Sequence, residues 1–149
     1  MRARHIVFGT VVALVTLAQA THGRIVEAGE ALGYRCTFSI AIYTSFDDGE
    51  WRPELGPTSF EFVLAAIDRE AGSAQIVGNV GAASATLTAG LEKETFLEVT
   101  PSGTVQVTVV YTKLPPQPEG RLPAIHSRHT GGIGIALPSQ QYGFCIPLS

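Results

Sequence analysis

The feature that most constrains this chain is an alternation of apolar and polar residues with a period of two. In Tyr34–Tyr43, every second side chain from Tyr34 onward is aromatic, aliphatic or cysteine, as expected of a strand with one buried face. Similar segments recur about every 8–12 residues, a spacing typical of sandwiches and barrels. The further strand segments are Phe60–Ile67, Ala74–Val80, Ala83–Thr88, Thr95–Thr100, Thr104–Tyr111, Ala124–Thr130, Ile133–Leu137 and Gln141–Cys145. We therefore predict an all-β chain of about seven to nine short strands, forming a single antiparallel β-barrel or β-sandwich.

The clearest hairpin joins Thr95–Thr100 to Thr104–Tyr111 through Pro101-Ser102-Gly103. This three-residue loop has glycine where a left-handed backbone conformation is needed. In the second arm, valines occupy one face, whereas Gln106 and Thr108 occupy the other. This pattern predicts an antiparallel strand with its valine face on the core and its polar face in solvent.

Proline marks two expected loops. Asp47–Glu50 turns the chain, and Pro53, Gly56 and Pro57 extend this turn into a longer loop. Several prolines in Leu114–Pro123 exclude that segment from a sheet ladder, so we expect an extended surface connection there.

The first twenty residues have the composition of a secretory signal peptide. Arg2 and Arg4 precede an apolar run over Ile6–Leu17, and Ala18-Gln19-Ala20 supplies a small-residue cleavage site. The run is shorter than the roughly 20 apolar residues that span a bilayer. We expect cleavage after Ala20, a single mature all-β domain over residues 21–149, no stable membrane insertion, and a periplasmic or secreted location.

The two cysteines lie near the ends of the expected mature chain. In an oxidising compartment disulfides persist, and Cys36 with Cys145 allows only one intramolecular pairing. The alternatives are a thiol nucleophile or a pair of metal ligands, but the chain has no C-x-x-C spacing. We predict a Cys36–Cys145 disulfide that holds the first strand beside the last.

Charge and composition exclude two broad classes. The chain is 45% apolar, which is too hydrophobic for a disordered protein. Removal of Arg2 and Arg4 with the signal peptide leaves eight basic residues against 13 acidic ones, a formal charge of −5. Phosphate backbones require a basic surface, so we expect no nucleic-acid partner.

The densest polar cluster is Ala124–Gly132, with two histidines, a serine and an arginine. His126 and His129 would share a metal only in a turn or helix, because strand positions three apart face opposite sides. Zinc also needs a third ligand, and a serine hydrolase would need a nucleophile that no G-x-S-x-G elbow supplies here. The alternative is a hydrogen-bonded strand and turn. We place candidate binding residues at His126, Ser127, Arg128 and His129, and predict no metal and no cofactor.

A second candidate surface is Pro138–Cys145, which combines amide, hydroxyl and aromatic side chains. Gln140 and Tyr142 complete the candidate binding set. The alternative is a closing strand in which Tyr142 packs over the disulfide.

Three segments resemble a group of small exported proteins of alphaproteobacteria that end in an S-R-H-T…P-S-Q-x-Y-G-x-C pattern. These segments are Phe96–Gly103, Ile125–Thr130 and Pro138–Cys145. The resemblance implies a bacterial source and carries no assigned activity.

The chain is also loosely similar to periplasmic lysozyme inhibitors of the small β-barrel type. Those proteins begin with a Y-x-C strand, end near a cysteine and carry a Ser-Gly loop. Tyr34, Cys36 and Cys145 occupy these places here, together with Ser102-Gly103, whereas the tryptophan-rich middle of that family is absent.

No coherent catalytic set emerges from these residues, so the leading hypothesis is a non-catalytic exported domain. Its partner would be a small ligand or an envelope or extracellular protein. The alternatives are a hydrolase or metal-dependent enzyme centred on His126 and His129, and an envelope-associated structural or inhibitor protein.

Overall fold

The computed structural model describes residues 31–115, 118–132 and 135–149, so the predicted signal peptide over residues 1–20 lies outside the described residues. Within the described part of the chain, the only helical element is one 3-10 turn at Pro118–Gly120. The remaining elements are strands. They are β1 (Gly33–Asp47), β2 (Glu50–Asp68), β3 (Ser73–Gly78), β4 (Gly81–Ala89), β5 (Lys93–Val99), β6 (Val105–Tyr111), β7 (Leu122–Gly132) and β8 (Ile135–Leu148).

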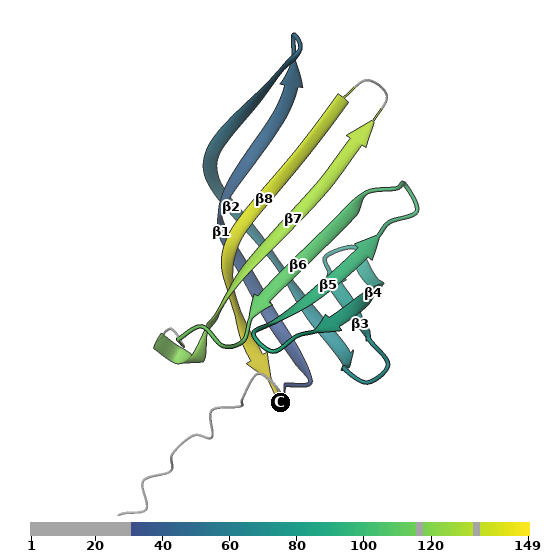
Figure 1. The fold of residues 1–149 in the computed structure, drawn as a ribbon, viewed down its shortest axis with the longest axis vertical. Coiled ribbons are helices and arrows are strands. Elements are labelled where there is room, and N and C mark those ends of the chain that lie inside the picture. The colour runs from purple at the N-terminus through teal and green to yellow at the C-terminus, as the bar shows by residue number, and fades with distance from the viewer. Residues whose placement is uncertain (1–30, 116–117, 133–134) are drawn as a thin grey trace, which may run out of the picture.

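The eight strands form one closed antiparallel barrel. Each strand pairs with the next in sequence, and β8 pairs with β1 to complete the ring (Figure 1). This confirms the all-β prediction and selects the barrel over the sandwich. The barrel wall is uneven, because β3–β6 have six to nine residues whereas β1, β2, β7 and β8 have 11 to 19. The longer strands rise above the others at one end of the barrel (Figure 1).

The predicted disulfide is confirmed at the seam where the barrel closes. Cys36 of β1 and Cys145 of β8 are direct cross-strand partners, with Cα atoms 4.0 Å apart, and both are buried. Two positions away, Gly143 faces Phe38, and a Cβ at Gly143 would overlap the backbone oxygen of Thr37. Covalent closure and close backbone approach therefore fix the β1–β8 register together.

The prediction of a loop at Pro53, Gly56 and Pro57 is wrong, because β2 runs through all three residues. Proline is tolerated in a strand whose N–H side has no ladder partner. The β2–β3 ladder covers only Val63–Asp68, so the first part of β2 pairs with β1 alone and has a free edge. The tolerance comes from this edge position, which local sequence does not specify.

The hydrophobic core fills the barrel interior, as expected of a small barrel. Its aromatic and aliphatic members come from alternate positions of the strands. The buried core residues are Ala31, Tyr34, Cys36, Phe38, Phe62, Leu64, Ala74, Ile76, Ala85, Leu87, Phe96, Val110, Leu122, Ala124 and Cys145.

The orientation predicted for β6 is wrong, because its polar side chains, and not the alternating valines, face the barrel interior. Thr108 is fully buried and Gln106 is half-buried, and both bond to inward side chains of neighbouring strands. The valines at alternate positions, such as Val107, are only half-buried. Polar residues occupy the interior side because β5 and β7 supply hydrogen-bond partners there, a property of the neighbours rather than of β6 itself.

Candidate functional site

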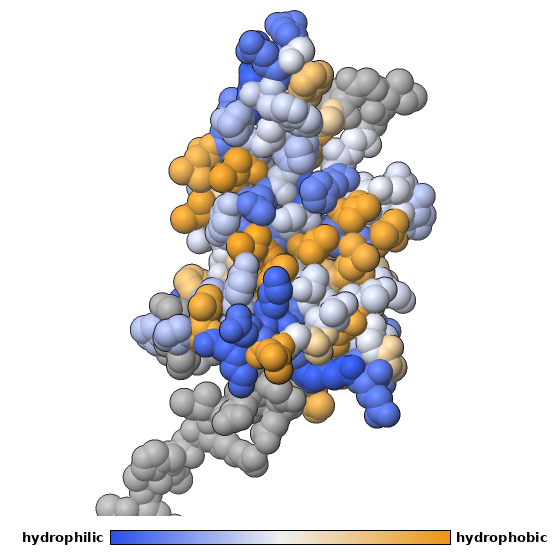
Figure 2. All heavy atoms as spheres, viewed as in Figure 1, coloured by the Kyte–Doolittle hydropathy of each residue, from blue (hydrophilic) through white to orange (hydrophobic). Residues whose placement is uncertain are grey.

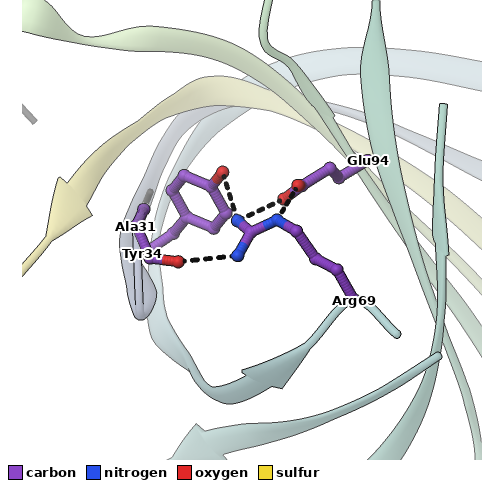
Figure 3. A network of polar contacts seen from close by, with 4 residues as sticks. All are labelled: Ala31, Tyr34, Arg69 and Glu94. Atoms are coloured by element: carbon purple, nitrogen blue, oxygen red, sulfur yellow. Dashed lines mark hydrogen bonds and ion pairs between the residues drawn. The ribbon is translucent and has the colours of Figure 1, made fainter. Parts of the chain in front are cut away.

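One end of the barrel, which we call the closed end, contains a partly buried polar network. The Arg69 guanidinium bonds the Glu94 carboxylate through Nε at 2.6 Å, the carbonyl oxygen of Ala31 at 2.9 Å and the Tyr34 hydroxyl at 3.4 Å (Figure 3). Glu94 is only 4% exposed. Burial and the Glu94 carboxylate raise the pKa of Tyr34, although Arg69 opposes this shift. The charged groups at this end therefore have partners within the barrel.

The opposite end is open and contains two cavities that share Phe60 and Arg128 in their linings. The outer cavity, of about 500 Å³, lies between the long β1–β2 hairpin and β7–β8. The inner cavity, of about 350 Å³, lies against β2–β4 and the polar side of β5–β7. Both volumes fall within the range of small-molecule sites. The residues used below line these cavities: Tyr43, Arg52, Phe60, Phe62, Ile76, Glu98, Gln106, His126, Arg128, Ser139 and Gln141.

His126 lies at the bottom of the inner cavity, with 1% of its surface exposed. Its ring lies 5.2 Å from the rings of Phe60 and Phe62, and 5.8 Å from that of Phe38. Its Nδ1 lies 2.9 Å from the Thr108 hydroxyl, whereas Nε2 has no hydrogen-bond partner among the described residues. Burial, and to a lesser extent the charge of Arg128, lowers the pKa of His126 to about 4. His126 is therefore neutral at neutral pH, and its Nε2 is buried without a hydrogen-bond partner among the described residues.

Two further polar atoms at the same end lack partners within the described chain. They are Nε of Arg128 and Oε1 of Gln141, both buried. Gln141 is the cross-strand partner of His126, and its own Nε2 donates to the Ser139 hydroxyl at 3.3 Å. The three unpartnered atoms thus belong to inward-facing residues of β7 and β8. We call His126, Arg128 and Gln141 the polar triplet.

Two acidic residues line the inner cavity: Glu98, which is 8% exposed, and Glu61, which is exposed. The Glu98 carboxylate accepts a hydrogen bond from Gln106 Nε2 at 3.2 Å. Gln106 of β6 is the cross-strand partner of both Glu98 on β5 and Arg128 on β7, so it lies between this acidic and this basic side chain.

The six binding residues expected from the sequence separate onto two faces of the barrel wall. His126 and Arg128 face the interior, whereas His129 is exposed on the outer face of β7. Ser127 and Gln140 also lie on the outer face, where the Gln140 amide donates to the Ser127 hydroxyl at 3.2 Å. The Tyr142 hydroxyl donates to Gln140 Oε1, so these three form an external cluster.

The alternation of β7 separates the two histidines that the alternative enzyme hypothesis placed in one centre. His126 and His129 lie on opposite faces of the strand and do not converge on one site. Within the described ranges, no group of three or more histidine, cysteine or acidic residues is arranged to hold a metal ion.

Gln141 is the member of the polar triplet that the sequence did not identify. It alternates with Gly143 and Cys145 on one face of β8, so the buried disulfide indicates its inward direction. This signal was present in the sequence. The sequence alone does not indicate that the side chains of Phe60 and Glu98 point into the barrel, because this depends on how the strands are paired.

A separate exposed feature is the tip of the β1–β2 hairpin. Phe46 and Trp51 lie 5.0 Å apart there and are 48% and 56% exposed. Figure 2 shows hydrophilic residues gathered at this tip and at the opposite end of the barrel, with hydrophobic residues across the middle. The tip is the strongest candidate for contact with another protein, because aromatic residues are enriched at interfaces.

Comparison of the chain with known protein families, curated proteins and solved structures returned no match. None of the helical structure in the described residues is long and apolar enough to cross a membrane.

Proposed function

We propose that this protein is a non-catalytic binding protein that holds a small molecule in the open end of its barrel. The observation that supports this proposal best is the convergence of the polar triplet on the two cavities. A binding site of this kind typically combines an apolar lining with a few polar groups that orient the ligand.

The two ends of the barrel differ in how their buried polar groups are satisfied. Arg69, Glu94 and Tyr34 bond one another at the closed end. At the open end, each unpartnered atom costs about 1–3 kcal/mol of desolvation free energy if nothing bonds it. A ligand that bonds two or three of these atoms would recover that cost on binding. Stability alone does not explain why such groups are placed at the open end.

The apolar lining supports the same interpretation. Phe60 and Phe62 pack against His126 on one side of the inner cavity. Ile76 and the small residues of β4 complete its wall. An aromatic or aliphatic part of a ligand would bury its surface here, which is favourable by about 25 cal/mol per Å².

We place this function outside the cytoplasm, in the periplasm or the medium. The basic and apolar pattern of the first twenty residues supports export. The buried Cys36–Cys145 bond supports the same location, because structural disulfides persist mainly in oxidising compartments.

Native mass spectrometry of the protein purified from its own host tests the proposal. We expect a species heavier than the polypeptide that loses its extra mass on denaturation. The denatured mass also reports cleavage after Ala20 and the loss of two hydrogens in the disulfide.

The matched controls are Arg128→Gln, inside the barrel, and His129→Gln, on the outside of the same strand. Arg128→Gln should lose the bound species, whereas His129→Gln should retain it. A bare wild-type polypeptide, or a bound species retained equally by both variants, would contradict binding at the open end.

A further inference from the structure

We propose that the ligand of the open end is an organic anion with an apolar body, whose carboxylate or similar planar head binds Arg128. This inference rests on the proposed function and specifies the chemistry of the ligand. It follows from three observations, which are the counterions of the arginines, the cavity that Glu98 lines, and the residues that line each of the two cavities.

Arg128 has no carboxylate counterion among the described residues, unlike Arg69 and Arg52. Arg69 pairs with Glu94 at 2.6 Å, and Arg52 lies 3.7 Å from both Asp47 and Asp48. No ion pair joins Arg128 to a carboxylate in the part of the chain that the structure describes, and its buried Nε has no hydrogen-bond acceptor.

Arg128 is half-buried, and its Nε is buried without an acceptor among the described residues. The planar fork of a guanidinium matches a carboxylate through two parallel hydrogen bonds. A planar anion would supply both the missing charge and the missing acceptors. A neutral ligand would supply acceptors but would leave the charge unbalanced. The lack of a carboxylate partner for Arg128 among the described residues therefore favours an anionic ligand over a neutral one.

The position of Glu98 sets the direction in which this anion enters. Glu98 lines only the inner cavity, so its carboxylate disfavours a second anion there. Arg128 also lines the outer cavity, together with Arg52 and the exposed Glu54, so the outer lining has two cations and one carboxylate. The inner lining has Arg128 with two carboxylates, those of Glu61 and Glu98. The anionic head therefore belongs on the outer side of Arg128.

The apolar body of the ligand then enters the inner cavity. Phe60 lies at the junction of the two cavities, and Phe62 and Ile76 line the inner one. Gln141 is buried and also lines the outer cavity. Head and body of one molecule can thus occupy both cavities.

The test uses matched acid and amide pairs, which share a hydrocarbon body and differ in charge. Benzoate with benzamide, hydrocinnamate with hydrocinnamide, and octanoate with octanamide provide bodies of increasing size. Titrations of the full mature protein are followed by NMR, including the Arg128 Nε–H signal. We expect the best acid to bind at least about tenfold more tightly than its amide and to shift the Arg128 signal.

Two variants connect this preference to Arg128. Arg128→Gln should reduce the acid-to-amide ratio to about one, whereas His129→Gln should leave it unchanged. Arg128→Lys, which retains the charge without the planar fork, should give an intermediate ratio. Dispersed NMR spectra establish that each variant is folded. If Arg128→Gln does not fold, the test is the intermediate ratio expected of Arg128→Lys, and a wild-type ratio in that variant overturns the assignment.

The outcomes separate this inference from the proposed function. Equal binding of acid and amide, or a preference that survives in Arg128→Gln, would overturn the anion assignment while leaving a ligand site at the open end. If no pair binds and the protein from its host carries no extra mass, both proposals are overturned.

Discussion

The folded protein should lose stability as the pH falls from 7 to 4, and His126 should account for a defined part of this loss. In the unfolded chain a histidine gains its proton near pH 6.5, but burial lowers the pKa of His126 in the folded barrel to about 4. Between these pH values the unfolded state therefore binds more protons. Linkage then requires the free energy of unfolding to fall with the pH.

The size of the effect follows from the pKa difference. A change of about 2.5 units at about 1.4 kcal/mol per unit corresponds to roughly 3 kcal/mol, reached once the pH is below 4. This is a large share of the 5–15 kcal/mol typical of whole domains. The physical source is the aromatic surroundings of the ring, since Phe38, Phe60 and Phe62 exclude water from it.

Urea denaturation between pH 4 and 7.5 measures this dependence, and an NMR titration of the imidazole signals gives the pKa directly. His126→Gln should remove about 3 kcal/mol of the pH dependence while it retains a polar partner for Thr108. His129→Gln, at the exposed position on the same strand, should leave the dependence in place. A measured His126 pKa of 6 or above, or equal pH dependence in wild type and His126→Gln, would refute the burial argument.

Three other predictions concern the barrel frame and are tested by thermal or urea unfolding. Gly143→Ala should destabilise the fold by about 3 kcal/mol or more, because its Cβ would overlap the neighbouring strand, whereas Gly78→Ala meets open space and should change stability little. Reduction of the disulfide should cost about 4–5 kcal/mol, since it closes a loop with a sequence separation of 109; a change in melting temperature of less than a few degrees would contradict this. Arg69→Leu should cost about 3–5 kcal/mol by leaving Glu94 buried without its cation. The double variant with Glu94→Leu should recover part of that loss, and strict additivity would argue against a coupled pair.

The strands and the disulfide could be predicted from the sequence because their signals are local or few. The alternation in Tyr34–Tyr43 lies entirely within β1, and two cysteines allow one pairing. Barrel closure is different, since it depends on β1 pairing with β8 across almost the whole described chain. The predicted disulfide places the first strand beside the last, but the alternation of the strands does not distinguish a closed barrel from a sandwich.

The errors in the sequence prediction also have a common cause, which is dependence on neighbouring strands. Pro53 and Pro57 are acceptable in β2 only because β3 does not extend alongside them. The polar face of β6 is inside only because His126 and Glu98 lie next to Thr108 and Gln106. Alternation identifies two faces of a strand, but the partners determine which face is the interior one.

The candidate site could be predicted in part. The cluster His126–His129 was identified by its density of polar residues, and the rule that divides it was available, because strand residues alternate between faces. Applied to β7, that rule pairs His126 with Arg128 and excludes His129 from the same face. Composition identified the segment, and periodicity would have selected the residues within it.

The difference between the two ends of the barrel is the strongest argument that the open end has a function. Both ends place charged or polar side chains inside a narrow apolar barrel, which is costly unless hydrogen bonds and counterions compensate. At the closed end Arg69 has a carboxylate, a hydroxyl and a carbonyl as partners. At the open end the polar triplet and two cavities occur together, and Arg128 has no carboxylate partner in the described chain. The same fold gives the half-buried Arg69 three kinds of partner, so the lack of a carboxylate partner at Arg128 among the described residues is a specific property of its surroundings. A bound anion is the partner that would make the two ends equivalent.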